Sequence, residues 1–454
     1  MPYRTLNPTT EEEVARYDLH TDSAVDAALA SSARAFDAWR ETAVAERGAS
    51  LERAAELLES ESSLLARLMA LEMGKPLAQG EAEARKCAWG CRFYAGSAEA
   101  FLRAEPRATE GASAWVRREP LGPLLAIMPW NFPFWQFYRF AAPALAAGNT
   151  VVLKHAPSTP QCALAIEDLM RRAGFPVGVV QNLFLSDDQA ARVIADDRVR
   201  GVTLTGSTRA GQAVAALAGR HVKPAVMELG GADPFIVLDD ADLAEAVRAG
   251  VDARCQNSGQ SCIAAKRFLV QRGIAAAFRE SFVAAMTARR VGDPLESGID
   301  IGPLARADLR DRLDEQVRRS LEAGARALCG GARPPGRGYF YPPTVLAEVR
   351  AESPAAEEEL FGPVAALVEF GRDDEAVALA NATRYGLGAS LWTRDRERAH
   401  RLVPRIEAGS VFVNGLVKSD PRLPFGGVKD SGFGRELGRE GLDEFVNLKT
   451  VWMA

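Results

Sequence analysis

Apolar runs alternate with helical patterns from residue 124 onward, and this alternation gives the clearest indication of the fold. Strands are predicted at the apolar runs 124–128, 150–153, 179–184 and 201–205. Between them, apolar residues recur with helical spacing over 134–147, 160–173 and 187–196. Strands that alternate with helices form parallel βαβ units, so we expect a parallel sheet with helices on both faces.

A second block with the same alternation begins near residue 225. Its strands are expected around 235–238, 268–270, 364–370, 387–392 and 411–413, and its helices near 241–254, 273–289, 304–323, 373–382 and 395–405. The chain is therefore predicted to be an α/β protein, in which two domains with doubly wound parallel sheets meet near residue 228.

The residues before this alternation have a different pattern. Helices are predicted at 22–39, which Asp22 can cap, and at 43–73. Residues 102–121 are charged, poor in large aliphatic side chains, and broken by a proline and a glycine. This composition predicts a hairpin that projects from its domain.

The longest uncharged run, 120–138, raises the alternative of a membrane-spanning segment. Four prolines and several polar side chains interrupt the run. These residues break a helix, so we interpret the run as a buried strand followed by a structured loop and expect no membrane association. The N-terminal residues are acidic rather than apolar and do not match a signal peptide.

Composition narrows the function classes further. The chain is 47% hydrophobic and 25% charged, which is typical of globular proteins, and its net charge of −5 offers no basic surface for nucleic acid. Six cysteines without a CxxC pair and four histidines provide no zinc-ligand spacing, so no metal is expected. Reduced thiols fit best in the cytoplasm, which is the predicted location.

Cys262 is the first candidate for chemistry. It follows the polar, turn-prone stretch 257–261 between a predicted helix and a predicted strand, which places the thiol on a loop. A thiolate there could attack a substrate covalently, and the backbone N–H beside it could bind the resulting oxyanion. The alternative is a small buried hydrophobic residue, which is the role of most free cysteines.

Glu228 and Asn131 are further candidates. Glu228 ends an apolar strand just before two glycines, at the strand end where open α/β sheets bind ligands, and it could act as a general base. Asn131 lies between two prolines directly after a strand, where a fixed amide suits an oxyanion site. A solvated edge acid and a rigid aromatic turn are the respective alternatives.

Gly206 and Ser207 follow a predicted strand and precede a predicted helix. The free N–H groups and the dipole of a helix N-terminus favour a phosphate. Neither GxGxxG nor GxxxxGK[ST] occurs nearby, so no standard dinucleotide fingerprint or P-loop supports this interpretation. A glycine that merely allows a tight turn remains the alternative.

Seven short motifs occur in one order between residues 129 and 427: PWNFP, VVLK, TGS, ELGG, GQSC, EELFGPV and PFGG. Their order and spacing resemble the aldehyde dehydrogenase superfamily, and the resemblance extends from NPTT at residue 7 to SGFGRE at 431–436. Each motif is weak alone, but seven in the same order are specific.

The resemblance implies a role for each matching residue. Cys262 matches the catalytic nucleophile, Glu228 the general base and Asn131 the oxyanion-hole amide. The residues expected to hold a nicotinamide dinucleotide are Trp130, Lys154, Ser158, Gly206, Ser207, Leu229, Glu359 and Phe361. No metal is implied.

The resemblance also implies a domain plan. Residues 1–102 and 122–228 would form the dinucleotide-binding domain, 229–420 the catalytic domain, and 421–439 would return to the first domain. The segments 103–121 and 440–454 would be oligomerisation elements of a homodimer or homotetramer.

Within the superfamily the chain is most similar to bacterial succinate-semialdehyde dehydrogenases of the shorter type. That similarity makes Arg139 the residue that binds the far carboxylate of the substrate, with Ser419 assisting and Trp135 forming a wall. The alternative for Arg139 is a structural role beside a resident acidic partner. Some relatives have a second arginine where this chain has Gln256.

The same comparison bears on the cofactor. Relatives that prefer NAD often have a glutamate three residues after the lysine, and this chain has Pro157 there. Without that carboxylate a 2′-phosphate is not repelled, so NADP is expected, with NAD possible. A dehydrogenase for another semialdehyde or an aliphatic aldehyde, and a catalytically silent family member, are the alternatives for function.

Overall fold

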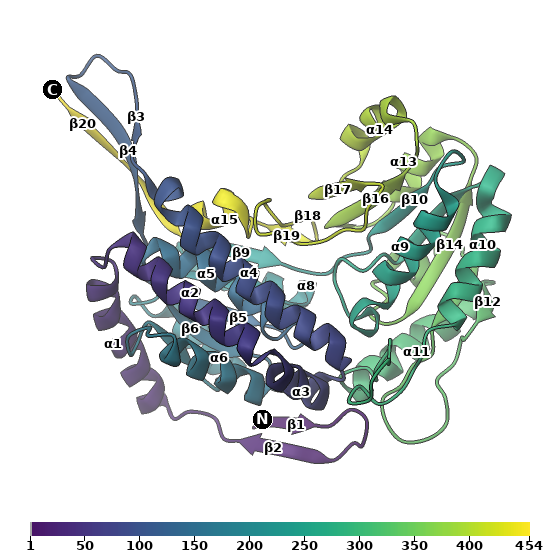
Figure 1. The fold of residues 1–454 in the computed structure, drawn as a ribbon, viewed down its shortest axis with the longest axis horizontal. Helices are drawn as coiled ribbons and strands as arrows, with labels where there is room; N and C mark the ends of the chain where they lie inside the picture. Colours follow the sequence, from purple (N-terminus) through teal and green to yellow (C-terminus); the bar gives the residue numbers. More distant parts are fainter. Residues whose placement is uncertain (1) are drawn as a thin grey trace.

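The computed structural model describes residues 2–454, which form two large sheets with helices on both faces (Figure 1). This is the predicted α/β class. The first sheet has the strand order β19-β9-β8-β5-β6-β7, and every neighbouring pair is parallel except β19 and β9. Its strands are β5 (Pro123–Met128), β6 (Thr150–His155), β7 (Val180–Asn182), β8 (Gly201–Thr205), β9 (Ala225–Glu228) and β19 (Gly432–Phe433).

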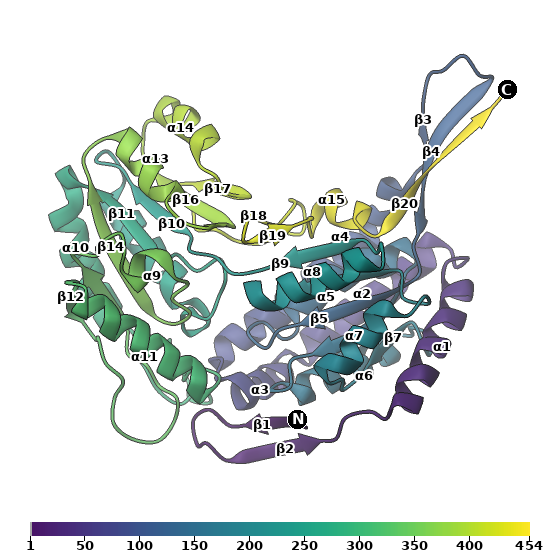
Figure 2. The ribbon, with the colours of Figure 1, turned by 180° about the vertical axis from the view of Figure 1, so that it is seen from behind.

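Two helical layers enclose the first sheet. One core joins the sheet to α2 (Val44–Ser60), α3 (Ser62–Met73), α4 (Leu77–Leu102), α5 (Trp135–Ala147) and α6 (Pro160–Arg172). A second core joins it to α1 (Asp22–Trp39), α7 (Asp187–Ala195) and α8 (Thr208–Arg220), which Figure 2 shows from behind. Every residue of α5 is buried, and the helix ends at Gly148, whose φ of 104° is a conformation that favours glycine.

The second sheet has seven strands in the order β12-β13-β14-β11-β10-β16-β17, and only β12 runs antiparallel to its neighbour. Its strands are β10 (Pro234–Val237), β11 (Arg267–Gln271), β12 (Arg326–Cys329), β13 (Thr344–Ala347), β14 (Val364–Phe370), β16 (Gly388–Trp392) and β17 (Ser410–Val413). The helices around it are α9 (Leu243–Cys255), α10 (Arg272–Thr287), α11 (Ala307–Glu322), α12 (Pro354–Glu357), α13 (Asp373–Asn381) and α14 (Arg396–Leu402).

A three-stranded antiparallel arm projects from the body of the molecule (Figure 1). It consists of β3 (Glu105–Pro106), β4 (Ser113–Pro120) and β20 (Val446–Met453), and β20 pairs with β4 along its whole length. The remaining short elements are β1 (Tyr3–Leu6), β2 (Glu13–Tyr17), β15 (Tyr385–Gly386), β18 (Val428–Lys429), α15 (Gly438–Asp443) and the 3₁₀ turns Gln256–Gly259 and Val403–Arg405.

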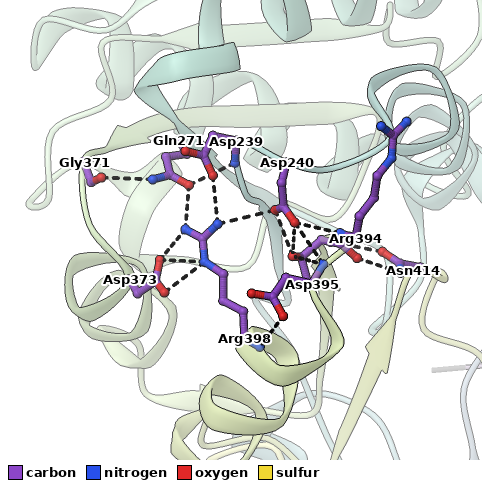
Figure 3. A network of polar contacts seen from close by, with 10 residues as sticks. Asp239, Asp240, Gln271, Gly371, Asp373, Arg394, Asp395, Arg398 and Asn414 are labelled. Carbon is purple, nitrogen blue, oxygen red and sulfur yellow. Dashed lines mark hydrogen bonds and ion pairs between the residues drawn. The ribbon is translucent and has the colours of Figure 1, made fainter.

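Arg398, on α14, is the centre of a polar network at one end of the second sheet (Figure 3). Its guanidinium donates to Asp239 Oδ1 at 2.8 Å, to Gln271 Oε1 at 3.0 Å and to Asp373 Oδ2 at 3.0 Å. These partners follow β10, end β11 and begin α13. One side chain therefore joins four elements that are distant in sequence.

The structure corrects several local predictions. The single helix expected over 43–73 is two helices, because Glu61 leaves the helical conformation with φ −102° and ψ 12°. Thr21, rather than Asp22, caps α1, since its hydroxyl accepts from Ala24 N at 3.2 Å. The long helix α4 and the strands β12 and β13 have no counterpart in the predicted pattern. The hairpin expected over 102–121 is present as β3 and β4.

The uncharged run 120–138 forms the central strand β5, a loop and the start of α5. Within residues 2–454, no helix combines the length and the apolar character that crossing a bilayer requires. The same residues contain no cluster of three or more potential metal ligands.

Candidate active site

A cavity of about 460 Å³ lies where the carboxyl ends of β5, β6 and β8 face the second sheet and α11. Parallel sheets bind ligands at this edge. The structure brings most of the predicted site residues together here. Those that line the cavity are Trp130, Asn131, Lys154, Gly206, Ser207, Leu229, Cys262, Glu359 and Phe361.

The loop before Cys262 has an unusual backbone. Asn257, Ser258 and Gly259 have φ values of 54°, 56° and 75°, all in the left-handed region. A Cβ at Gly259 would lie 2.3 Å from the backbone of Gly362, so only glycine fits. Such a backbone persists only where neighbours hold it, and it presents the next residues in a fixed geometry.

Several side chains hold this loop in place. Asn257 donates its amide N–H to the Asn131 carbonyl at 2.7 Å, and Arg254 Nη2 donates to the Gly259 carbonyl at 2.7 Å. Lys266 Nζ donates to the carbonyl of Cys262 at 2.7 Å and to that of Ser261 at 2.9 Å. None of these anchoring side chains is recognisable from local sequence, because each acts through a tertiary contact.

The Cys262 thiol lies at the cavity wall and packs against the core of the first sheet. Burial raises the pKa of this thiol to about 12, although the charge of Arg139 and that of Lys266 oppose the rise. Cys262 is partly accessible and lines the cavity, whereas Cys87, Cys91, Cys162 and Cys255 are buried. At neutral pH Cys262 is therefore held as the thiol.

Glu228 ends β9 and is only 2% exposed, which excludes the alternative of a solvated edge acid. Both of its carboxylate oxygens lack a hydrogen-bond partner within residues 2–454. Burial raises the pKa of Glu228 well above its usual value, and the charge of Arg139 opposes this rise. The side chain does not line the cavity, but its charge acts on the Cys262 thiol.

Asn131 directs its side chain toward the loop that carries Cys262. Its Nδ2 donates to the Gln260 carbonyl at 3.1 Å, and the residue is 5% exposed. The amide is thus fixed beside the segment that carries Cys262, as an oxyanion donor requires.

The predicted cofactor residues occupy two walls of the cavity. Ser207 caps α8 by accepting from Ala210 N at 3.3 Å, and Lys154 is buried with Asp187 3.6 Å away. On the opposite wall Glu359 accepts from Gly231 N at 3.0 Å, and Phe361 lies edge-on to Trp130 with ring centroids 5.7 Å apart.

Ser158 does not line the cavity, although its buried hydroxyl has no partner within the described chain. Three arginines that sequence analysis did not select also line it: Arg209, Arg306 and Arg312. Their basic side chains suit an anionic ligand.

The three predicted substrate residues lie apart from the cavity lining. Trp135 and Ser419 are in contact, since Trp135 Nε1 donates to Ser419 Oγ at 2.9 Å. Arg139 forms an ion pair with Glu436, and each side chain is 2% exposed. The structure therefore contains the resident acidic partner of the alternative explanation, so Arg139 is not a free cation.

Arg139 lies near Glu228 and Cys262 instead. Its charge lowers the pKa of Glu228 and of Cys262 against the effect of burial, and its Nη2 donates to Thr205 Oγ1 at 3.3 Å. Burial also raises the pKa of Glu436, and the Arg139 charge opposes it. One cation thus stabilises two buried carboxylates.

Comparisons with known proteins agree with this arrangement of residues. The aldehyde dehydrogenase family model matches residues 1–451. The chain is 51% identical to "Succinate-semialdehyde dehydrogenase [NADP(+)] 1" of Mycobacterium tuberculosis (strain ATCC 25618 / H37Rv), with both chains covered in full. It is 49% identical, again over the full length of both, to a probable NADP(+) enzyme of the same name from Synechocystis.

Solved structures show the same likeness. Succinic semialdehyde dehydrogenase from Streptococcus pyogenes, solved in complex with NADP+, matches with a TM-score of 0.97 at 36% identity over 99% of each chain. A structure titled for cofactor and substrate selection by Gox0499 matches over the whole of both chains with a TM-score of 0.99 at 43% identity. The chain belongs to the aldehyde dehydrogenase family.

Proposed function

We propose that the protein oxidises succinate semialdehyde to succinate with NADP⁺. The observation that carries the proposal is the joint presence of Cys262, Glu228 and Asn131 around one loop, in a chain half identical over its full length to enzymes named for this reaction. A catalytically silent member would have no need of an intact nucleophile, base and amide.

The cavity suits a phosphorylated dinucleotide. Lys154 supplies a buried cation whose pKa burial lowers, and Pro157 puts no carboxylate beside it. Gly206 and Ser207 offer a helix N-terminus for the pyrophosphate, and the Glu359 carboxylate on the cavity wall could accept from a ribose hydroxyl. When bound, the cofactor would accept the hydride, and residues of the protein would carry out the other steps.

The residues divide the reaction as follows. The Cys262 thiol releases its proton to solvent water, the thiolate attacks the aldehyde carbon, and the oxyanion accepts from Asn131 Nδ2 and from the backbone N–H of Cys262. Departure of hydride leaves a thioester on Cys262. Glu228, in the carboxylate form that the charge of Arg139 favours, takes a proton from water; the hydroxide attacks the thioester, and the acid and the thiol are released.

The proposal also includes the expectations for the domains, the assembly and the location of the protein. The first sheet, with the returning β19, would be the dinucleotide-binding domain, and the second sheet the catalytic domain. The projecting arm would join copies into a homodimer or homotetramer. Six free cysteines suit a reducing cytoplasm.

Variants of the nucleophile and the base test the mechanism. With succinate semialdehyde and NADP⁺, the wild type should produce NADPH continuously, and Cys262→Ala should retain less than a few per cent of that rate. Glu228→Gln should release up to one NADPH per site in a burst and then stall, since only hydrolysis of the thioester needs the base. Stopped-flow absorbance of NADPH measures both.

Control measurements distinguish an error in the assigned residues from an error in the assigned substrate. Cys255→Ala removes a buried thiol outside the cavity and should turn over steadily. Normal turnover by Glu228→Gln would contradict the base assignment. A wild type that prefers glutarate semialdehyde or butyraldehyde by kcat/KM would contradict the substrate but leave the mechanism intact.

A further inference from the structure

Lys86, on α4, carries a half-buried ammonium that lies beside Trp135 and Ser419. Its Nζ donates to Ser419 Oγ at 2.7 Å and lies 4.5 Å from the centroid of the Trp135 ring. No carboxylate within residues 2–454 pairs with it. A lysine sheltered in this way normally has an anionic partner.

The acids near Lys86 are already paired with other cations. Glu83 forms a buried ion pair with Lys75 and also accepts the backbone N–H groups of Phe134 and Trp135. Asp420 binds Arg422, with Oδ2 and Nη2 2.6 Å apart. Neither carboxylate is free to neutralise the Lys86 charge.

Hydrogen-bond donors exceed acceptors at this point. Ser419 Oγ accepts from both Lys86 Nζ and Trp135 Nε1, so its two lone pairs are used. Two N–H groups of Lys86 and the O–H of Ser419 are left without an acceptor in the described structure. Three unused donors beside one uncompensated charge match the two oxygens of a carboxylate.

The charge state of Lys86 agrees with this imbalance. Burial, together with the charge of Arg139, lowers the pKa of Lys86 to about 8, although Cys87, Glu83 and Asp420 oppose the shift. A bound anion would restore the ammonium form.

The position of this cluster relative to the nucleophile is suitable. Trp135 begins α5, immediately after the loop that contains Asn131. The core around Trp135 is also the core against which Cys262 packs. Arg139 acts electrostatically on both Lys86 and Cys262, so both groups lie within the range of one guanidinium charge. A short semialdehyde could thus extend from the sulfur toward Lys86.

We propose that Lys86, together with Ser419, binds the far carboxylate of the substrate and so determines the preference for a semialdehyde. The inference rests on the proposed function and names the cation that recognises the carboxylate. It also explains why Arg139 can remain paired with Glu436. Trp135 positions Ser419 through its indole N–H.

The experiment compares two aldehydes of equal length, succinate semialdehyde and butyraldehyde. Lys86→Met removes the charge but keeps most of the side chain. The ratio of kcat/KM for succinate semialdehyde to that for butyraldehyde should fall about tenfold or more, and Lys86→Arg should restore most of it. Arg85→Met is the matched control, because it removes an exposed cation one residue away on the same helix.

A binding measurement supplements the kinetics. Calorimetric titration of the wild type with succinate and with butyrate should show tighter binding of succinate, and Lys86→Met should remove the difference. This readout needs no turnover, and NADP⁺ binding by the variant verifies that it is folded.

The outcomes distinguish the two proposals. A wild type with no preference for succinate semialdehyde over butyraldehyde contradicts the proposed function. A wild type with that preference, which Lys86→Met and Arg85→Met both retain, overturns the role of Lys86 alone. Loss of both aldehydes in parallel in folded Lys86→Met also overturns it, because the lysine is then structural.

Discussion

At the scale of single residues, the thiol of Cys262 combines two opposed requirements. A nucleophile has to be reactive toward the substrate and unreactive toward everything else. Burial keeps the pKa near 12, so very little thiolate exists at neutral pH, while Lys266 and the left-handed turn keep the sulfur in position. The cysteine is thus placed for attack before it is ionised.

The raised pKa of Cys262 predicts how the cofactor-free protein reacts with iodoacetamide. Below its pKa a thiol gains thiolate about tenfold per pH unit, so labelling of Cys262 should rise about a hundredfold between pH 7 and pH 9. Mass spectrometry of the Cys262 peptide measures the rate. Cys262→Ser provides the blank, and a plateau near pH 8 would contradict the raised pKa.

At the scale of elements, the sequence pattern predicts the parallel strands well, because strands buried on both faces are continuous apolar runs. It fails for α4, whose apolar residues are mostly small or cysteine, and for β12, which lies at the edge of its sheet and is partly exposed. The periodic spacing of apolar residues, on which the prediction depends, is weak in both α4 and β12.

The residues of the candidate site also divide into those that the sequence indicates and those that only the fold reveals. Cys262, Glu228 and Asn131 are recognisable because each belongs to a short motif at a fixed place in the chain order. Glu436, Lys266 and Lys86 act through contacts with residues far away in sequence, and no local pattern marks them. Arg139 shows this limit of prediction from sequence most clearly, since only the fold reveals which acidic residue pairs with it.

The Arg398 network predicts a pH-dependent contribution to stability. The hydrogen bond from Arg398 lowers the pKa of Asp373 below its unfolded value, so this stabilisation is present above the unfolded pKa and is lost as pH falls through the folded one. Arg398→Met should therefore lower Tm by about 2–4 °C at pH 7 and by less near pH 3.5, where part of this stabilisation is already lost.

Differential scanning calorimetry at the two pH values checks this expectation. Arg396→Met is the control, since it lies on the same helix and outside the network. An equal loss of Tm at both pH values would mean that the aliphatic stem of Arg398, rather than its charge, stabilises the sheet end.

At the scale of the whole molecule, the projecting arm exposes large apolar side chains. Leu448, Trp452 and Met453 on β20 are 53%, 50% and 54% exposed. Exposed apolar side chains gathered on one element mark a surface for association with another protein chain. A second copy that covers the arm would remove these side chains from water.

Trp452→Glu should accordingly weaken assembly. A buried charge in the interface is costly, so sedimentation velocity should show a smaller species than the wild type at the same concentration. Val177→Glu is the matched control, because Val177 is 84% exposed and lies outside the arm. An unchanged sedimentation coefficient would place the interface elsewhere.

The pairing of β19 with β9 sets the order in which the enzyme can mature. Gly432 pairs with Glu228, so the strand that carries the base has an open edge until the entire second sheet has been translated. An open edge invites non-native pairing with other chains, and the nascent chain carries this one throughout synthesis of the second half. Translation that stops before Phe433 would leave the Cys262 loop complete but β9 paired with β8 alone. The sheet that holds Glu228 is thus completed only after the whole second sheet has been made.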